Sequence, residues 1–253
     1  MMKKIVFSLL AAALCLPAAK AFSPYENYLQ SGRPTHVMLA AAVLPEKTNA
    51  LYTALRAAVA DPAARRAGLT NFAVFSRKLG EKQCVFVYFD YPGDRDYLDA
   101  VEDFEKLPGV KALSAFIKPI PPAADRGHTW LQLEWINFIR GSLNDGPATN
   151  RFAMVTRIKP KDEDHYRSLH QTTWPGIIDW MNRKGWRNFS IFFAEIDGAL
   201  YEFYYTEEVP SEHPATNLDK DPCLLRWLNL TAPCQDPLPD AQGTWSPMKA
   251  VLK

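Results

Sequence analysis

The sequence predicts an α+β protein made of two tandem ferredoxin-like units, each with the element order β-α-β-β-α-β. Three observations carry this prediction. A short motif recurs in the two halves of the chain, the same succession of strand-like and helix-like segments surrounds each copy, and a turn with an aromatic strand follows each copy. The 253 residues, of which 47% are hydrophobic and 23% charged, suffice for two units with sizeable cores.

The recurring motif has the frame Gly-x-x-Asn-Phe, then a small residue, a β-branched residue and Phe. It spans residues 68–75 in the first copy and residues 185–192 in the second. An internal repeat indicates that the chain is assembled from copies of one supersecondary unit. We therefore divide the chain into a first half, residues 30–143, and a second half, residues 151–253, joined by a linker rich in Asn, Gly and Pro.

The first half begins with an apolar strand at residues 36–43, followed by Pro45 and a helical stretch. The motif then forms a second strand, which a turn at residues 78–81 connects to an aromatic strand at residues 84–91. A short helical piece and a closing apolar strand around residues 135–139 complete this half.

The second half repeats this order, with a strand at residues 151–158, Pro160, a helical stretch and the second copy of the motif. A turn at residues 197–198, an aromatic strand at residues 200–205 and a closing strand at residues 245–252 follow. Such a unit makes one antiparallel sheet with helices on one face, so its bare face needs cover. We expect the two sheets to cover each other, as a pseudo-dimer of the dimeric α+β barrel kind within one chain.

The beginning of the chain predicts a secretory signal peptide over residues 1–21. A positively charged head precedes an apolar run at residues 5–16, which is too short to span a bilayer, and a small-x-small cleavage site ends at Ala21. No later apolar run approaches the length of a membrane helix. We expect a secreted or periplasmic protein without a membrane partner after cleavage.

Charge and motif content argue against several classes of function. The chain has 29 Lys and Arg against 28 Asp and Glu, which leaves no electrostatic footprint for a nucleic acid. Paired-cysteine and HExxH metal spacings, a glycine-rich phosphate loop and a GxSxG elbow are all missing from the sequence. We therefore expect no metal and no other cofactor.

Three cysteines follow the predicted signal peptide. Cys84 lies in a strand-like run, where a small buried hydrophobic residue is expected. Cys223 and Cys234 lie in one Pro-rich stretch, where a disulfide and free thiols both stay open.

One pattern distinguishes the second half from the first. Tyr166, His170 and Trp174 recur every four residues, which on a helix places a phenol, an imidazole and an indole on one face. Pro175 should kink or restart that helix. Residues of these types at this spacing also serve as core residues, so a structural interpretation stays open. Trp227 and the aromatic strands favour a site that offers aromatic faces to a sugar ring.

Three motifs occur in order along the second half: Tyr-x-x-x-His-x-x-x-Trp-Pro from Tyr166, Gly-x-x-Asn-Phe-Ser-Ile-Phe from Gly185, and Asp-Pro-Cys-Leu-Leu-Arg-Trp from Asp221. Together they resemble the L-rhamnose mutarotase family, and the resemblance covers residues 151–252. It implies a ferredoxin-like fold that pairs as a dimer, a small-molecule sugar, L-rhamnose or a similar one, as the partner, and no cofactor.

The resemblance also implies roles for individual residues. His170 takes the position of the catalytic proton donor, and Tyr166, Phe189 and Trp227 take positions that contact the sugar. Trp174, from the first motif, is a further candidate for substrate binding. Three positions depart from the family pattern, and these are Phe189 in place of Tyr, Leu228 in place of a second Trp, and Gly176 in place of an acidic residue.

The resemblance implies an aldose mutarotase, an isomerase of carbohydrates that interconverts α and β anomers by general acid–base catalysis. An imidazole with an unperturbed pKa near 6.5 can give or take the proton near neutral pH. In the first half, Leu51 and Leu55 align with Tyr166 and His170, so that half is interpreted as a structural partner whose own site has lapsed. Two alternatives stay open: a non-catalytic secreted sugar-binding or regulatory module of the same fold, and an oxygenase-like α+β barrel.

Overall fold

The computed structural model describes residues 33–211 and 216–252. The predicted signal peptide, residues 1–21, lies outside the described residues. Over these ranges, none of the helices is long and apolar enough to cross a membrane.

The elements follow the predicted order in both halves. The first half contains strands β1 (Thr35–Val43), β2 (Thr70–Leu79), β3 (Lys82–Tyr91), β4 (Ile117–Lys118), β5 (Leu131–Gln132) and β6 (Glu134–Gly141), and helices α2 (Thr48–Ala60), α3 (Pro62–Arg66), α4 (Ala100–Lys106), α5 (Pro108–Lys111) and α6 (Pro121–Ala124). The second half contains strands β7 (Asn150–Ile158), β8 (Trp186–Ile196), β9 (Ala199–Glu208), β10 (Gln235–Asp236), β11 (Ser246–Pro247) and β12 (Lys249–Leu252), and helices α7 (Glu163–Gln171), α8 (Pro175–Lys184) and α9 (Pro222–Thr231). The predicted linker, residues 144–150, has no regular structure up to Thr149, and β7 begins at its last residue, Asn150.

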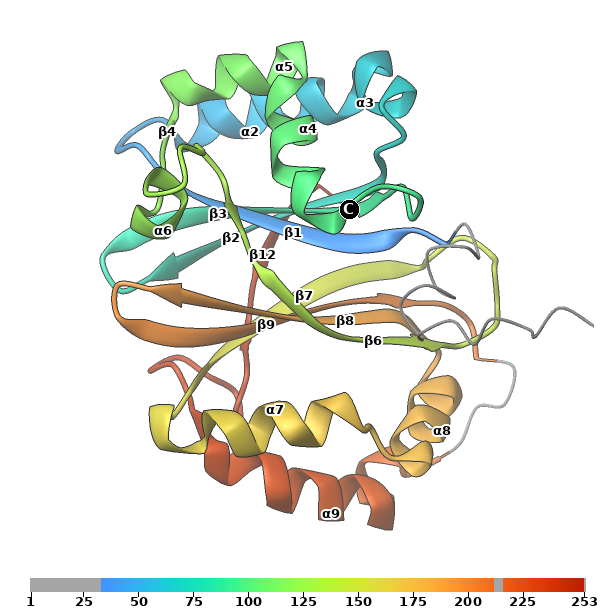
Figure 1. The fold of residues 1–253 in the computed structure, drawn as a ribbon. Coiled ribbons are helices and arrows are strands. Elements are labelled where there is room, and N and C mark those ends of the chain that lie inside the picture. Colours follow the sequence, from blue (N-terminus) through green and yellow to red (C-terminus); the bar gives the residue numbers. More distant parts are fainter. Residues whose placement is uncertain (1–32, 212–215, 253) are drawn as a thin grey trace, which may run out of the picture.

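Two antiparallel sheets lie face to face in the middle of the molecule, and helices cover their outer faces (Figure 1). Helices α2 to α5 cover the first sheet, and α7 to α9 cover the second. The buried cluster between the sheets draws side chains from both halves: Tyr88 stacks on Tyr205 with 3.7 Å between ring centroids, and Phe86 lies 4.9 Å from Phe203. This arrangement confirms the predicted fold class, in which each sheet covers the bare face of the other.

Equivalent strands follow the same order in the two sheets, but each sheet takes one strand from the other half of the chain. The first sheet has the order β12-β2-β3-β1-β4 with β5 on β1, and the second has β10-β7-β9-β8-β6 with β11 on β7. Strand β6 of the first half thus pairs with β8, and strand β12 of the second half pairs with β2. The expectation that each closing strand completes its own half is wrong in this detail. Apolar alternation in a strand does not select the edge that the strand joins. The open edge at β8 belongs to the second sheet and takes β6, and the open edge at β2 belongs to the first sheet and takes β12.

The Gly and Asn of the recurring motif are explained by the backbone. Asn71 and Asn188 adopt left-handed conformations with φ of 53° and 52°, at bulges where β2 and β8 shift register. Asn tolerates this region better than most residues. Gly185, with φ of 75°, ends α8, and a Cβ there would lie 2.3 Å from the carbonyl oxygen of Val209.

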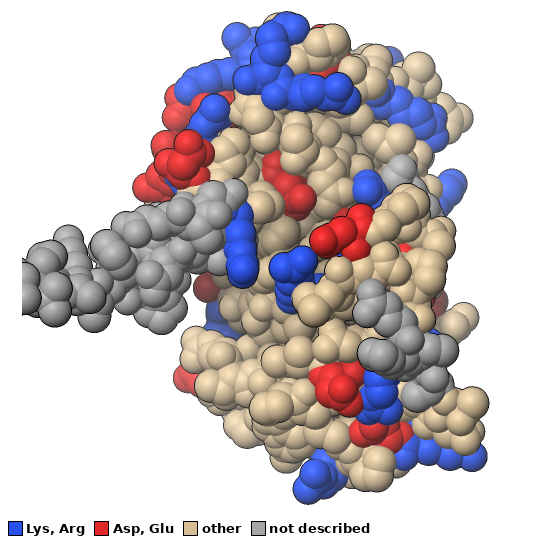
Figure 2. All heavy atoms as spheres, turned by 90° about the vertical axis from the view of Figure 1, so that its right-hand side faces the viewer, with Lys and Arg blue, Asp and Glu red and all other residues tan. Residues whose placement is uncertain are grey.

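The surface carries both signs of charge. In Figure 2, Lys and Arg side chains are interspersed with Asp and Glu over the visible face.

All three cysteines of the described residues are free thiols, so Cys223 and Cys234 are not joined, and Cys84 is buried as expected. Burial raises the pKa of the Cys84 thiol to about 12.

Candidate functional site

A cavity of about 260 Å³ lies between the outer face of the second sheet and helices α7, α8 and α9. Most of its wall is aromatic or aliphatic, and its polar groups come from α7, β9, β10 and the end of α9. Of the predicted site residues, the wall includes Tyr166, His170, Phe189 and Trp227. Ile139 on β6 also contributes, so the strand borrowed from the first half forms part of the cavity.

Helix α7 presents Tyr166 and His170, four residues apart, to the sheet, and both side chains are buried. Their ring centroids lie 4.4 Å apart. The helix ends at Gln171, and α8 begins at Pro175, so the predicted restart at the proline is observed.

Trp174 does not share a helical face with Tyr166 and His170, and this part of the sequence prediction is wrong. The residue before a proline is driven to extended backbone, and Trp174 has φ of −64° and ψ of 139°. Its ring packs edge-on against Trp227, with 5.4 Å between centroids, behind the cavity wall. The α7–α8 junction is held by Asn137 of β6, which donates a hydrogen bond to Oγ1 of Thr173 at 2.9 Å.

The hydrogen bonding of His170 defines which nitrogen is available. Its Nδ1 lies 3.0 Å from the carbonyl oxygen of Tyr166. Because a carbonyl only accepts, Nδ1 carries the hydrogen, and in the neutral ring Nε2 keeps a lone pair. Burial lowers the pKa of His170 to about 4. The sequence-based assumption of an unperturbed imidazole is therefore corrected: at neutral pH His170 is a neutral ring with a proton-accepting nitrogen.

Helix α9 brings Trp227 to the cavity. Asp221 caps this helix by accepting hydrogen bonds from the amides of Cys223 and Leu224 at 2.8 and 3.2 Å. Arg183 of α8 pairs with the same carboxylate at 2.6 Å, which ties the two helices together. Trp227 then lies edge-on to His170, with 5.2 Å between ring centroids.

Aromatic side chains of β8 and β9 form the floor. Phe189 lies 5.0 Å from the ring of Tyr204 and stacks in parallel with Trp186 at 6.0 Å. The indole Nε1 of Trp186 is buried and has no hydrogen-bond partner among the described residues. A donor left unpaired in an aromatic wall is costly unless a ligand or water accepts from it.

Sequence reasoning missed Glu202, the fourth residue of β9. Leu200, Glu202 and Tyr204 alternate with residues that face the other sheet, so the carboxyl group points toward the helices and into the cavity wall. Neither carboxyl oxygen has a hydrogen-bond partner with good geometry among the described residues. Burial raises the pKa of Glu202 to about 8, and its neighbours Tyr166 and Gln235 lower it in part. A carboxylate in the middle of the aromatic run at residues 200–205 was the signal available in the sequence.

Tyr166 links this carboxyl to the rest of the site. Its hydroxyl accepts a hydrogen bond from Nε2 of Gln235 on β10 at 3.1 Å. Burial, reinforced by the charge of Glu202, raises the pKa of Tyr166 well above its usual value. The phenol therefore stays protonated and keeps its proton to donate.

Two of the departures from the family pattern have a structural setting. A Cβ at position 176 would lie 2.5 Å from Sγ of Cys223, so the packing of α9 on α8 leaves no room for an acidic side chain there. Leu228 lines the cavity and is 39% exposed, which places it at the rim.

The corresponding region of the first half is filled. Leu51 and Leu55 of α2 are fully buried and belong to one apolar cluster with Val85 and Val87 of β3. These leucines occupy the α2 positions that align with Tyr166 and His170. The interpretation of the first half as a structural partner agrees with this packing.

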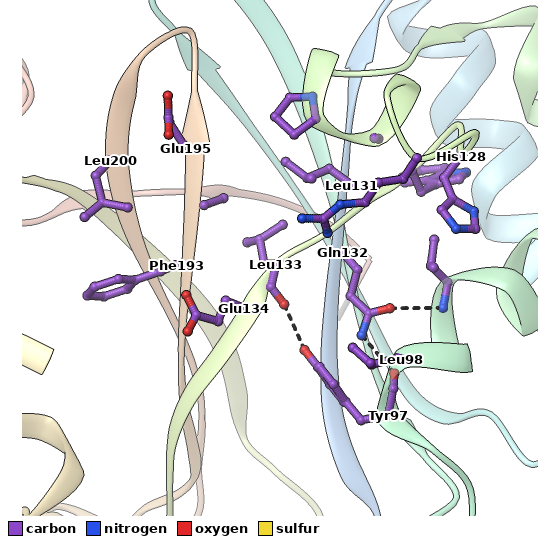
Figure 3. Close-up of a pocket in the computed structure, with 16 residues that line it drawn as sticks. Tyr97, Leu98, His128, Leu131, Gln132, Leu133, Glu134, Phe193, Glu195 and Leu200 are labelled. Atoms are coloured by element: carbon purple, nitrogen blue, oxygen red, sulfur yellow. Dashed lines mark hydrogen bonds between the residues drawn. The ribbon is translucent and has the colours of Figure 1, made fainter.

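A second, larger hollow of about 640 Å³ opens where the chain crosses from the first sheet to the second (Figure 3). Two of its labelled polar side chains are hydrogen-bonded: Tyr97 donates to the carbonyl of Leu133 at 2.8 Å, and Gln132 donates to the carbonyl of Tyr97 at 2.9 Å. Glu134 pairs with Arg167 at 2.9 Å. In the smaller cavity, the Glu202 carboxyl and the Trp186 indole have no well-formed hydrogen bond among the described residues, so this cavity is the candidate site. Among the described residues, no group of three metal-ligating side chains is close enough to hold a metal ion.

Comparisons with known proteins agree with the second half of the sequence prediction. Residues 151–253 match the family model of L-rhamnose mutarotase. An L-rhamnose mutarotase of Sinorhizobium fredii is 24% identical over 102 residues, which are 40% of this chain and 95% of that protein. An L-rhamnose mutarotase of Mesorhizobium japonicum is 22% identical over 102 residues, 40% of this chain and 94% of that protein. These matches confirm the resemblance carried by the three motifs.

A solved structure is similar over both halves. The crystal structure of a candidate monooxygenase of Fusobacterium nucleatum covers 87% of this chain and 93% of its own, with a TM-score of 0.47 and 12% identity.

Proposed function

Since residues 151–253 are similar to the L-rhamnose mutarotases, we propose that this half of the chain is an aldose mutarotase. It interconverts the α and β anomers of L-rhamnose or a related sugar. The observation that carries the proposal is the meeting of Tyr166, His170 and Trp227 in one cavity within the matched residues. The predicted signal peptide would place this activity in the periplasm or outside the cell.

The cavity suits a single pyranose ring. About 260 Å³ accommodates one monosaccharide, and the indole of Trp227 and the ring of Phe189 offer flat apolar faces to its C–H groups. Trp186 Nε1, Gln235 and Tyr166 supply hydrogen-bonding groups for hydroxyls. The methyl group of a 6-deoxy sugar is compatible with such an apolar wall.

Mutarotation requires one proton to leave the anomeric hydroxyl and another to reach the ring oxygen. Nε2 of His170, with its lone pair, takes the first proton as general base. The ring then opens, the carbonyl turns, and closure on its other face gives the second anomer. This reaction needs no electron carrier and no activated donor.

The test is the rate of anomer exchange, measured by NMR saturation transfer on L-rhamnose and on other neutral sugars. We expect His170→Ala to lose the catalysed exchange by about 100-fold or more, the usual contribution of a general acid–base residue. The matched control is His165→Ala, which removes an exposed imidazole from the same helix and should leave the rate unchanged. Binding of the sugar without any catalysed exchange would contradict the proposal and favour the non-catalytic binding module.

A further inference from the structure

Glu202 is an ionisable side chain in the cavity wall, and the reaction proposed above assigns it no role. It is fully buried, and both carboxyl oxygens lack a well-formed hydrogen bond among the described residues. A buried carboxyl group without a well-formed hydrogen bond is costly, so a protein that keeps one is a candidate for using it.

The fold itself does not need an acid at this place. Glu202 pairs with Phe193 across the β8–β9 hairpin, and Val85 pairs with Ser76 at the same position of the β2–β3 hairpin. Val85 is fully buried in the apolar cluster that contains Leu51 and Leu55. The same architecture is therefore completed with aliphatic side chains in the first half, where the second half has Tyr166, His170 and Glu202.

Glu202 also has a relation to the groups that touch the proposed substrate. It lines the same cavity as Tyr166 and His170, whose ring centroids lie 4.4 Å apart. The wall of this cavity therefore combines a carboxyl group from the sheet with an imidazole from α7.

We propose that Glu202 is the general acid of this site and that His170 is its general base. This inference rests on the proposed mutarotase function and adds to it a catalytic residue that the family motifs do not contain. The ring oxygen of the sugar receives its proton from the Glu202 carboxyl.

The step balances in atoms and electrons. Nε2 of His170 takes the proton of the anomeric hydroxyl while the bond between the anomeric carbon and the ring oxygen breaks, and the ring oxygen takes the proton of Glu202. The products are the open-chain aldehyde, an imidazolium and a carboxylate. After the carbonyl turns, the same hydroxyl attacks its other face, its proton returns to Glu202, and the imidazolium returns its proton to the anomeric oxygen.

The protonation states suit these roles at neutral pH. The pKa of Glu202, raised to about 8, keeps the carboxyl protonated, and the pKa of His170, lowered to about 4, keeps the imidazole neutral. The other titratable groups nearby are Tyr166, Tyr204 and Cys234, and burial raises the pKa of each, so they stay uncharged. Helices α8 and α9 and strand β8 supply only uncharged side chains to the cavity wall.

The experiment follows anomer exchange from pH 5 to pH 9 in the wild type, Glu202→Gln and Glu202→Val, with sugar binding read from tryptophan fluorescence. Glu202→Val introduces the residue that the first half has at the equivalent position, Val85. This variant keeps the proposal testable if Glu202→Gln does not fold. We expect exchange to fall by about 100-fold or more in both variants, with binding kept. The wild-type rate should fall as the pH rises through about 8.

Infrared spectroscopy reports the protonation state of Glu202 directly. We expect a protonated-carboxyl stretch at pH 7 that disappears in Glu202→Gln and, in the wild type, as the pH rises through about 8. An ionised Glu202 at pH 7, or a Glu202→Gln variant that matches an active wild type, overturns the role of Glu202 alone. A wild type that exchanges no sugar's anomers overturns the proposed function.

Discussion

Replacing Glu202 by Gln should change how the stability of the protein depends on pH. The carboxyl has a pKa of about 8 in the folded chain against 4.5 for the ordinary group. Between these values the folded state holds a proton that the unfolded state has released, so stability falls as pH rises. His170 acts in the opposite sense: its pKa falls from 6.5 to about 4 on burial, so stability is lost as pH falls below 6.5.

The two effects offset each other between about pH 4.5 and 6.5, and above pH 6.5 only Glu202 acts. At about 1.4 kcal/mol for each pH unit, with a slope that halves as the pH reaches the pKa of Glu202, the wild type should lose about 1–2 kcal/mol of unfolding free energy between pH 6.5 and 8. In Glu202→Gln, stability should not decline between pH 6.5 and 8. It should instead show the effect of His170 alone, with stability that decreases as the pH falls from 6.5 to 4.5.

Urea unfolding at pH 4.5, 6.5 and 8, followed by tryptophan fluorescence, measures these differences. The matched control is Glu195→Gln, which removes an exposed carboxyl from β8 and should follow the wild-type curve. A wild type as stable at pH 8 as at pH 6.5, or a Glu202→Gln variant with the same decline, would refute the assignment of a buried protonated carboxyl.

Three further predictions concern the same site. Tyr166→Phe removes the hydroxyl that accepts from Gln235 but keeps the ring, so anomer exchange should slow by about 10-fold at most; a loss as large as that of His170→Ala would contradict this. Because Leu51 and Leu55 fill the first half, calorimetric titration with a bound sugar should give about one site per chain, and two equivalent sites would oppose the lapsed-site interpretation. Gly176→Glu should destabilise the protein to urea by about 1–3 kcal/mol through its clash with Sγ of Cys223, and Cys223→Ala should relieve this loss.

Much of the fold could be predicted because local and global signals agree. The recurring motif around Asn71 and Asn188 marked two equivalent strands, and Pro175 marked the place where the helix restarts as α8. The exchange of β6 and β12 could not be predicted, because strand alternation encodes which face is buried and not which edge is joined. The division of the chain at residues 30–143 and 151–253 stays a prediction about sequence units, since each sheet takes a strand from both.

The candidate site, like the fold, could be predicted only in part from the sequence. His170, Tyr166 and Trp227 were accessible from the sequence because they combine unusual side chains with helical spacing or a motif. Glu202 was not, since a glutamate in a strand is ordinarily solvated, and only the packing of the helices over the second sheet buries it. The pKa of His170 likewise depends on burial, which residue type and spacing do not determine.

The pairing of β12 with β2 has a consequence for how the chain is made. Arg56 donates a hydrogen bond to the carbonyl of Val251 across 195 positions of sequence. At a synthesis rate of about 5–20 residues per second, the edge of β2 waits on the order of ten seconds or more for its partner strand. An open apolar edge is a template for pairing with other chains. Until β12 is available, the edge of β2 therefore stays an unpaired strand.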